Sequence, residues 1–563
     1  MKIFNILTTI SPPKVYSALL LGTLAGLAYA MLIPLVMNSF TAVDGFKEAL
    51  QQPVTFLTLE VSKASFAALF LVACILVMAA RTFAELILTR IAIDAASDLR
   101  RQYYNRILRA PLNKLESVGG PQLIASITTD VRTIIQGAQL LPDLLISAVT
   151  VLGMMLFLLY LNTEVFIFFC GALLFGVITF QLPLLLGSKY IGRAREKVDE
   201  LQHAIHGNIY GIKELKLCQR KRNAYMEKVL CKTEDDVRGA QKTGFTIMRI
   251  ALNYGDILSF FVIGFLAFIF VNYHTITQQE MFGVIMVLLY ITGPIGVVVN
   301  AAPQIISSNI SLAKVEKLFA ELPIEDIDTD IKPLPQWQQF QLRNLTYRYA
   351  SKDQEPGFEI GPLNLTVNKG SITFIVGGNG SGKTTLGKLI TSHYLPLGGH
   401  IYLDNLPIDH KYVASYRNAI CAITSDFYLF DQLLGEAENA DIAVIEDYLE
   451  ELCLSDKVKI HQGKFSTLAL SDGQRKRLAL LIAYLEDKDL YLFDEWAADQ
   501  DPEFKQIFYR RILPELKAKG KAIIVISHDD SYFDVADHVV KMQNGHFRPA
   551  AEIQVLPPAT KVG

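Results

Sequence analysis

Six long apolar runs occupy most of the chain before residue 320, and they constrain its fold more than any other feature. A helix needs about 20 predominantly apolar residues to cross a bilayer. Any one run is compatible with a buried helix of a soluble protein, but six in succession favour a membrane domain. The composition agrees, with 51% hydrophobic and 19% charged residues. The predicted spans are Val15–Phe40, Ala64–Ala80, Leu144–Leu161, Val165–Leu186, Ile257–Val271 and Met281–Ala302.

Lysine and arginine are concentrated in the two long segments that join spans two to three and four to five. The other connecting segments carry only Lys47. By the positive-inside rule the basic segments are cytoplasmic, and so are both termini of this multi-pass chain. The basic residues are Arg90, Arg100, Arg101, Arg106, Arg109, Lys189, Arg193, Arg195, Lys197, Lys213, Lys216, Arg220, Lys221 and Arg222. The net charge of −3 does not favour a nucleic-acid partner.

Both basic segments are rich in helix-favouring residues, so we expect them to extend the flanking spans as long helices. Turn-forming residues interrupt each segment near its middle, at Gly119-Gly120-Pro121 and at Gly207–Gly211. Two long helices joined by a short turn can press that turn against a cytoplasmic domain.

From residue 339 onward, short β-branched or aromatic runs alternate with helical segments, which indicates an α/β domain with a largely parallel sheet. The runs are Ile372–Val376, Leu490–Phe493 and Ala522–Ile526. The predicted boundaries are a transmembrane domain at 1–318, a linker at 319–338, a nucleotide-binding domain at 339–550 and a tail at 551–563. The predicted fold class is therefore a six-span α-helical membrane domain followed by an α/β P-loop NTPase domain.

The strongest motif is the segment Gly377–Thr384 (GGNGSGKT), which matches the phosphate-binding pattern G-x-x-x-x-G-K-[ST]. It follows a predicted strand, Ile372–Val376, and precedes a helical run. Backbone N–H groups of such a loop wrap phosphates, with Lys383 reaching the β- and γ-phosphates and the Thr384 hydroxyl ligating Mg²⁺. The sequence predicts an ATP site with Mg²⁺, formed by Gly377, Asn379, Gly380, Ser381, Gly382, Lys383, Thr384 and Thr385.

A second motif is the apolar strand Leu490–Phe493, which ends in two carboxylates, Asp494 and Glu495. Asp494 is placed to hold Mg²⁺ through water, and Glu495 to polarise the attacking water. Alone, an apolar run ending in two acids is a weak motif. Downstream of the phosphate loop it predicts the catalytic carboxylate and a metal ligand.

Between these motifs, Leu470–Arg477 (LSDGQRKR) opens a helix. An N-capped helix with a basic, solvated first turn is the alternative interpretation, because Ser and Asp are good caps. The order of the three motifs nevertheless resembles the ATP-binding-cassette (ABC) family, whose signature is usually LSGGQ. Nearly the whole chain resembles an ABC exporter half, which implies an ATP-hydrolysing transporter of the bacterial inner membrane.

The resemblance implies roles for the signature residues. Ser471 and Gly473, with Gln474 beside them, match positions that face the γ-phosphate bound by the opposite subunit. Catalysis would then require a dimer, and a homodimer of this chain would have two competent sites.

Other positions carry over from the same family. Asp501 matches the acidic residue that communicates between the two sites, and His528 matches the switch histidine that contacts the γ-phosphate. Tyr349 matches the aromatic residue that stacks on adenine. Tyr347 is its rival, and an ordinary strand aromatic is the alternative for both.

Three features depart from the family pattern. Ser425 stands where the family has a glutamine that senses Mg²⁺, so either its hydroxyl or a water contacts the metal, or the cycle is slower or differently coupled. Asp472 replaces a signature glycine, and its carboxylate should point away from phosphate. The stretch from Ser425 to Ser471 is shorter than usual, which indicates a trimmed helical subdomain.

These departures, together with Trp496 after the second motif, resemble a bacterial subgroup that exports cyclic peptides and peptide siderophores of the pyoverdine, syringomycin and microcin type. The resemblance implies a peptide-like substrate, a homodimer in the lipid bilayer, and periplasmic or outer-membrane export components as further partners. A lipid flippase or multidrug exporter shares every motif, and one half of a heterodimer is a further alternative. The fused spans disfavour an importer.

Overall fold

The computed structural model describes residues 2–44, 54–56, 59–61, 64–272, 277–349 and 357–548. It divides into two compact units, one formed by residues 1–105 and 121–320 and the other by residues 106–120 and 321–563. The division at residue 320 falls in the predicted linker. The segment 106–120 belongs to the second unit, which the sequence-based boundaries did not anticipate. The predicted tail at 551–563 lies outside the described residues.

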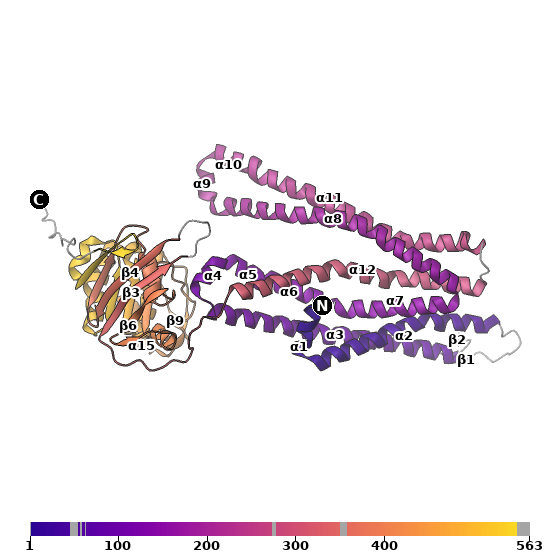
Figure 1. Ribbon diagram of the computed structural model, residues 1–563, viewed down its shortest axis with the longest axis horizontal. Helices are drawn as coiled ribbons and strands as arrows, with labels where there is room; N and C mark the ends of the chain where they lie inside the picture. The colour runs from indigo at the N-terminus through magenta and orange to yellow at the C-terminus, as the bar shows by residue number, and fades with distance from the viewer. Residues whose placement is uncertain are drawn as a thin grey trace. The chain divides into compact units, whose positions relative to one another are not determined.

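The first unit consists mainly of long helices (Figure 1). Basic segments that were expected to extend the spans are helical over most of their length, as predicted. The helices are α1 (Lys2–Ile10), α2 (Pro12–Asp44), α3 (Ala64–Arg109), α5 (Gly120–Ala125), α6 (Val131–Gln139), α7 (Leu141–Leu161), α8 (Thr163–Tyr210), α9 (Ile212–Leu217), α10 (Gln219–Tyr225), α11 (Lys232–Phe268) and α12 (Gln278–Glu321).

Five helical stretches among the described residues are long and apolar enough to cross a membrane: Pro12–Met37, Ala67–Arg109, Gly120–Leu161, Thr163–Phe180 and Glu280–Glu321. They contain the predicted spans three and six and overlap most of the predicted spans one, two and four. The predicted span Ile257–Val271 falls mainly on the end of α11 and is not among the five, so it stays a prediction. Several long apolar helices therefore precede the nucleotide-binding domain, as the sequence predicts.

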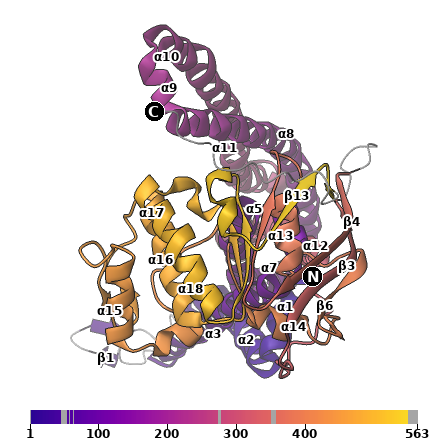
Figure 2. The same ribbon diagram turned by 90° about the vertical axis from the view of Figure 1, so that its left-hand side faces the viewer.

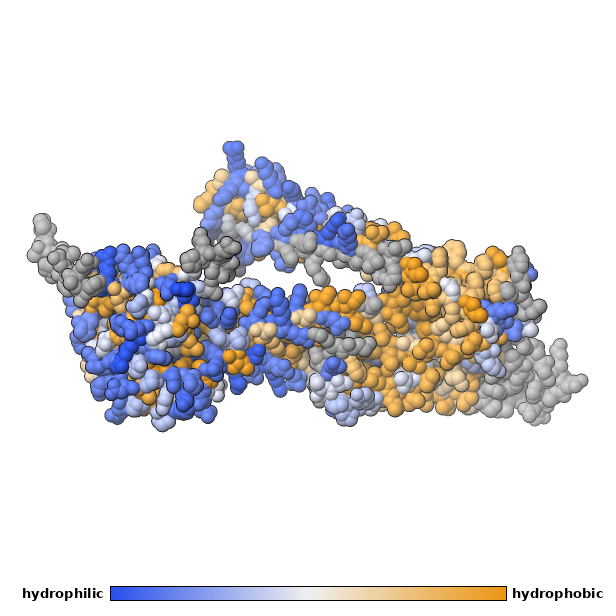
Figure 3. All heavy atoms as spheres, in the orientation of Figure 1, coloured by the Kyte–Doolittle hydropathy of each residue, from blue (hydrophilic) through white to orange (hydrophobic). Residues whose placement is uncertain are grey.

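Apolar packing joins the long helices at one end. One buried cluster draws Ile33 from α2, Leu158 from α7, Phe169 from α8, Leu266 from α11 and Val287 from α12. In this unit hydrophobic residues gather over that end of the helices, and hydrophilic residues cover the other (Figure 3). Such a change along one helix is expected where it leaves a bilayer and continues into water.

The second unit contains a six-stranded sheet in the order β14-β13-β5-β12-β11-β8, parallel except for β14. The three predicted strands are confirmed as the adjacent strands β5, β12 and β11. Bounds of the strands are β5 (Ile372–Val376), β8 (Ile420–Ile423), β11 (Leu490–Asp494), β12 (Ala522–Ile526), β13 (His538–Gln543) and β14 (His546–Phe547).

A second, antiparallel sheet has the order β4-β3-β6-β7. Its strands are β3 (Gln339–Arg348), β4 (Glu359–Asn368), β6 (Gly398–Leu403) and β7 (Leu406–Pro407). The sequence-based prediction was of one largely parallel sheet, and this antiparallel sheet was not predicted. Along β4 buried and exposed residues alternate, so one face is packed and the other is exposed.

Helices cover both faces of the parallel sheet (Figure 2). On one face α16, α17 and α18 form a core with Phe374, Tyr491 and Val525. On the other, α13, α14 and the antiparallel sheet form a second core with Ile375 and Ile524. Successive residues of one strand enter opposite cores because their side chains point alternately to the two faces of the sheet. The bounds of the α-helices in this unit are α4 (Leu112–Val118), α13 (Lys383–Ile390), α14 (Val413–Asn418), α15 (Ile442–Glu451), α16 (Asp472–Glu486), α17 (Pro502–Ile507) and α18 (Leu513–Ala518).

Candidate nucleotide site

The loop between β5 and α13 has a backbone that only glycine readily adopts. Gly380 and Gly382 have φ values of 75° and 103°, where a side chain would be strained. A Cβ on Gly377 would lie 2.3 Å from the carbonyl oxygen of Met542 on the neighbouring strand β13. The loop therefore keeps its backbone bare ahead of the α13 N-terminus, which is the geometry of a phosphate cradle.

Two side chains of this loop are buried hydrogen-bond donors. Lys383 folds back so that its Nζ donates to the carbonyl oxygens of Gly377, at 2.9 Å, and Gly378, at 3.1 Å. The Ser381 hydroxyl is buried and has no hydrogen-bond partner among the described residues. Buried donors are normally satisfied, so both groups suit a phosphate. Thr384 stands exposed in the first turn of α13.

Asp494 ends β11 as a carboxylate that is only 2% exposed. Its Oδ1 is buried without a hydrogen-bond partner in the described part of the chain. Burial, with a smaller contribution from Glu495, raises the pKa of Asp494 to about 6, although Lys383 opposes the rise. A buried carboxylate with an unused oxygen fits a hard divalent cation such as Mg²⁺.

Glu495 and His528 meet at the ends of neighbouring strands. Asp494 pairs with Ile526 in the parallel ladder of β11 and β12, so Glu495 and His528 follow at the same edge. The Nε2 of His528 lies 3.1 Å from Oε1 of Glu495, and both side chains are half-exposed. The structure thus brings together the predicted catalytic carboxylate and the predicted switch histidine.

Ser425 lies in the turn after β8, at this same edge of the sheet. Ile423 pairs with Phe493, so Ser425 stands two residues beyond the end of the strand that neighbours β11. The adjacent Asp426 adds negative charge that, after burial and Glu495, contributes to the raised pKa of Asp494. Asp426 was not among the predicted site residues.

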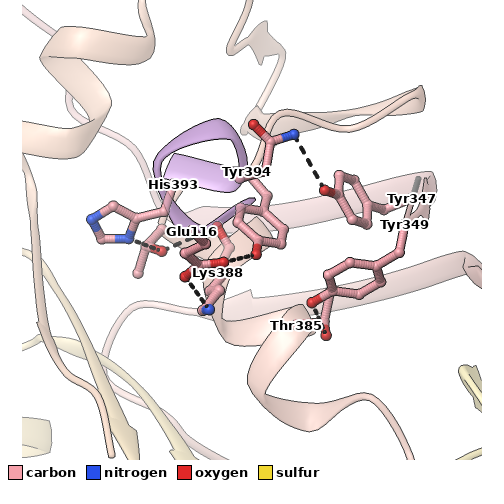
Figure 4. A network of polar contacts seen from close by, with 9 residues as sticks. Glu116, Tyr347, Tyr349, Thr385, Lys388, His393 and Tyr394 are labelled. Carbon is pink, nitrogen blue, oxygen red and sulfur yellow. Dashed lines mark hydrogen bonds and ion pairs between the residues drawn. The ribbon is translucent and has the colours of Figure 1, made fainter. Parts of the chain in front are cut away.

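Of the two rival tyrosines, the structure buries one and leaves the other accessible. Tyr347 is 5% exposed and belongs to the core, whereas Tyr349 is only partly buried. The Tyr349 hydroxyl lies 3.0 Å from Oγ1 of Thr385, the residue next to the predicted metal ligand (Figure 4). An adenine ring can stack only on an accessible face, so the geometry favours Tyr349.

A carboxylate from α4 contacts the same network (Figure 4). Glu116 Oε1 forms an ion pair with Lys388 Nζ on α13 at 2.7 Å, and its other oxygen accepts a hydrogen bond from the Tyr394 hydroxyl. The Tyr394 ring packs against both Tyr347 and Tyr349. The turn helix that precedes Gly119 is therefore joined to the phosphate-loop helix and to the candidate adenine stack.

The signature segment begins α16 with a capping box. The Ser471 hydroxyl accepts from the backbone N–H of Gln474, and the Gln474 side chain accepts from the Ser471 N–H. Ser471 and Asp472 are exposed, as a capped first turn requires. The alternative interpretation of a solvated basic turn does not hold for Lys476, which is buried.

The segment after Glu495 packs against this helix. A Cβ on Gly473 would lie 2.8 Å from the carbonyl oxygen of Asp499, so only glycine allows the approach. Asp501 caps α17 by accepting from the Phe504 N–H, which lowers the pKa of its carboxyl, and it forms an ion pair with Arg477. The predicted residues Gly473 and Asp501 thus lie within one packed region.

Comparisons with known proteins agree with this geometry. The family model for the ABC transporter domain matches residues 360–498. A relative from Pseudomonas syringae pv. syringae, "ATP-binding protein SyrD", is 34% identical over 464 residues, which cover 79% of this chain and 81% of SyrD. The chain belongs to the ABC transporter family. It is an ATP-hydrolysing exporter, and the candidate phosphate loop lies within the matched residues.

The fold of the whole ABC transporter agrees with that of a solved exporter. A structure titled "Structure of a bacterial Atm1-family ABC exporter with ATP bound" aligns with a TM-score of 0.75 at 17% identity and covers 96% of this chain and 95% of that one. A further relative, the "ATP-dependent lipid A-core flippase" of Bordetella avium, is 25% identical over 497 residues, which cover 82% of this chain and 80% of the flippase.

Several polar residues of this ABC transporter's site escaped the sequence analysis. Glu116 lies in a loop between spans, far from every motif. Lys476 belongs to a basic run that looks solvated, and Gln500 follows the second motif without a distinguishing pattern. Their contacts in the folded protein identify all three residues. For Lys476 and Gln500, a position beside motif residues is a weak signal in the sequence.

Proposed function

We propose that this exporter moves a peptide-type substrate, such as a cyclic peptide, a peptide siderophore or a microcin, across the bacterial inner membrane as a homodimer with cytoplasmic termini. The pattern of Ser425, Asp472 and Trp496 carries the proposal, because it resembles the peptide-exporting subgroup. The proposal is supported by sequence identity, because the chain is 34% identical to SyrD and 25% identical to the lipid A-core flippase of Bordetella avium.

A lipid substrate is the second candidate. The "ATP-dependent lipid A-core flippase" of Bordetella avium matches 82% of the chain, and every nucleotide-site residue would serve a flippase equally. A multidrug exporter and one half of a heterodimer remain alternatives of the same fold. The substrate therefore has to be distinguished by what leaves the cell or changes leaflet.

The signature residues act on the nucleotide of a second copy in this proposal. Ser471 is exposed at the start of α16, and its hydroxyl and backbone N–H form the capping box with Gln474. A helix N-terminus with exposed Ser471 and the small Gly473 suits the γ-phosphate of a facing site. The catalytic unit is then a dimer with two composite sites.

Hydrolysis is chiefly positioning and charge stabilisation in this class of reaction. Lys383, now bonded to loop carbonyls, turns to the β- and γ-phosphates when ATP enters. Glu495 orients the attacking water and accepts its proton, and His528, 3.1 Å away, holds that carboxylate and contacts the γ-phosphate. Thr384 and Asp494 would hold Mg²⁺, with Ser425 as a further candidate ligand; the metal neutralises phosphate charge when bound.

The test compares cells that carry the wild type with cells that carry Glu495→Gln, which keeps the side-chain shape and removes the base. We expect ATP hydrolysis to fall by about a hundredfold or more, and secreted peptides to disappear from the medium while accumulating inside. Membranes of both strains are analysed for lipid species on the outer face.

The outcomes separate the candidates. Loss of ATPase activity with unchanged peptide secretion overturns peptide export. A defect confined to lipid distribution assigns the flippase function instead. Unchanged ATPase activity of the variant removes Glu495 from its catalytic role.

A further inference from the structure

A buried lysine lies between the signature helix and the segment that carries the candidate base. The Lys476 side chain on α16 is only 6% exposed, and its Nζ forms an ion pair with Asp499 Oδ2 at 2.8 Å. The same Nζ donates to the backbone carbonyl oxygen of Glu495 at 2.9 Å. Burying an ammonium group is costly unless it is paired and hydrogen-bonded, so these two acceptors define where it can lie.

The backbone of Lys476 is fixed to the same segment. The indole Nε1 of Trp496 donates to the Lys476 carbonyl oxygen at 3.0 Å. The Trp496 ring is fully buried and stacks on Phe508, with 4.3 Å between ring centroids. The Lys476 side chain therefore bonds to Glu495 and Asp499, and the Trp496 side chain between them bonds to the Lys476 backbone.

The carbonyl that Lys476 contacts belongs to a residue in an unfavourable conformation. Glu495 has φ 50° and ψ 33°, a left-handed geometry that costs energy in a residue with a Cβ. Such a conformation persists only where its surroundings over-determine it. The Glu495 N–H donates to the Ile526 carbonyl oxygen at 2.9 Å, and the Glu495 carbonyl oxygen accepts from the Ala498 N–H at 3.2 Å and from Lys476 Nζ at 2.9 Å. Lys476 is thus the side chain that holds this carbonyl beside a backbone donor.

We propose that Lys476 is a positioning residue for the Glu495 carboxylate. It holds the left-handed backbone of Glu495 so that the carboxylate meets His528 and the attacking water. Lys476 stands five residues after Ser471 on one continuous helix, so it also ties the base of one site to the signature residue that serves the other. This inference rests on the proposed role of Glu495 in hydrolysis.

Other contacts hold α16 in place without Lys476. Arg477 Nε donates to Gln500 Oε1 at 2.9 Å, and Gln500 Nε2 donates to the Gly473 carbonyl oxygen at 3.0 Å. The apolar side of α16 is buried in the core through residues such as Leu478 and Leu481. Replacing Lys476 with an apolar residue of similar length is therefore expected to leave the helix packed.

The chain contains a matched control. Lys521 is 11% exposed, pairs with Asp487 Oδ1 at 2.9 Å, and donates to the Asp487 carbonyl oxygen at 3.1 Å. Asp487 is left-handed as well, with φ 44°, but it ends α16 and takes no part in the nucleotide site. Lys521→Met thus removes the same types of contact at a place that should not affect Glu495.

The experiment uses the full chain in proteoliposomes with ATP and Mg²⁺ and measures kcat, the KM for ATP and the unfolding midpoint. Misplacing a catalytic group by about 1 Å can cost about a hundredfold. We expect Lys476→Met to lower kcat by about ten- to a hundredfold with little change in KM. Lys476→Arg, which keeps the charge, should recover part of that loss. Lys521→Met should keep the wild-type kcat although its midpoint falls comparably.

A double variant tests whether Lys476 acts through Glu495. Lys476→Met combined with Glu495→Gln should hydrolyse ATP no more slowly than Glu495→Gln alone. The inference fails if Lys476→Met lowers kcat no more than Lys521→Met does. It also fails if Lys476→Met lowers the kcat of Glu495→Gln by the same factor as it lowers the kcat of the wild type. If Lys476→Met does not fold, Asp499→Asn is measured in its place and is likewise expected to lower kcat. Wild-type activity of Glu495→Gln would overturn the proposed function itself, which is a different result.

Discussion

The carboxylate of Glu116 lies 2.7 Å from the ammonium of Lys388, joining the turn helix α4 to the phosphate-loop helix α13. Burial is the largest single influence and would lower the pKa of Lys388, but the hydrogen bond and charge of Glu116, with the charges of Tyr349 and Asp426, together outweigh it and raise that pKa. We predict that Glu116→Gln lowers the transport obtained per ATP hydrolysed while basal hydrolysis persists. The ratio of transport to phosphate release in proteoliposomes measures this.

The free energy of unfolding should hardly change in Glu116→Gln. Glu116 is 38% exposed, and partly exposed ion pairs contribute less than about 1 kcal/mol. Glu200→Gln, which removes the exposed ion pair with Lys197 on α8, is the control and should leave the ratio unchanged. Equal ratios in both variants would contradict the coupling role of Glu116.

Asp494→Asn should stabilise the nucleotide-free protein. The folded carboxyl titrates near 6 instead of its usual 3.8, so between these values the folded protein binds a proton that the unfolded chain has released. The contribution of the Asp494 carboxyl to the free energy of unfolding therefore falls as pH rises from 3.8 to about 6, by about 3 kcal/mol in total. We expect the unfolding midpoint of the variant to exceed the wild type above about pH 6, and Mg²⁺ to raise only the wild-type midpoint. A variant that is less stable at neutral pH would refute this.

Tyr349→Ala should weaken ATP binding, because base stacking on an aromatic side chain contributes about 1–3 kcal/mol. Tyr349→Phe keeps the ring and loses only the contact with Thr385, so its affinity should stay near the wild type. Tyr347→Phe should likewise leave affinity unchanged, since that ring is in the core. Binding of a fluorescent ATP analogue measures all three, and an effect confined to Tyr347 would reverse the assignment.

Ser425→Ala should reduce substrate-stimulated ATPase activity if the serine senses Mg²⁺, because the alanine offers no oxygen to the metal or its water. Ser425→Gln restores the amide usual in the family and should hydrolyse at least as fast as the wild type. The Mg²⁺ concentration for half-maximal activity is the measurement. Unchanged values in both variants would assign the sensing role to another residue, with Asp426 the nearest candidate.

Two inactive chains should restore activity when they assemble together. Lys383→Ala disables a phosphate loop and Ser471→Arg disables a signature segment, so each homodimer is inactive in the proposed arrangement. A mixed dimer contains one composite site in which both parts are intact. ATPase activity after co-expression, compared with each variant expressed alone, tests this; no recovery in a purified mixed dimer would argue against a signature that acts between copies.

The motif-bearing strands could be predicted because their signals are local. Ile372–Val376 and Ala522–Ile526 are short apolar runs with punctuating residues at both ends, and the structure has them with the same bounds as β5 and β12. Their shared sheet edge follows from parallel pairing, but the contact between Glu495 and His528 at that edge is a finding of the structure.

Contacts between distant segments could not be predicted in this way. Glu116 lies 272 residues from Lys388, and no periodicity links an exposed turn to a helix in another part of the chain. Lys476 looked solvated because its neighbours Arg475 and Arg477 are charged, whereas its burial depends on acceptors that only the folded segment after β11 provides. The antiparallel sheet, in contrast, carries a local signal that was missed, because residues 363–368 of β4 alternate apolar and polar as a half-exposed strand does.

The left-handed backbone at Glu495 has a consequence for comparing related sequences. Few residue types accept that conformation at low cost, with Gly, Asn and Asp foremost and β-branched residues least suited. A homologue that has lost hydrolysis but kept its architecture should therefore carry one of the tolerant residues at this position. A valine or isoleucine there would indicate that the strand end itself has been rebuilt, so the identity of the replacement distinguishes a silenced site from a remodelled one.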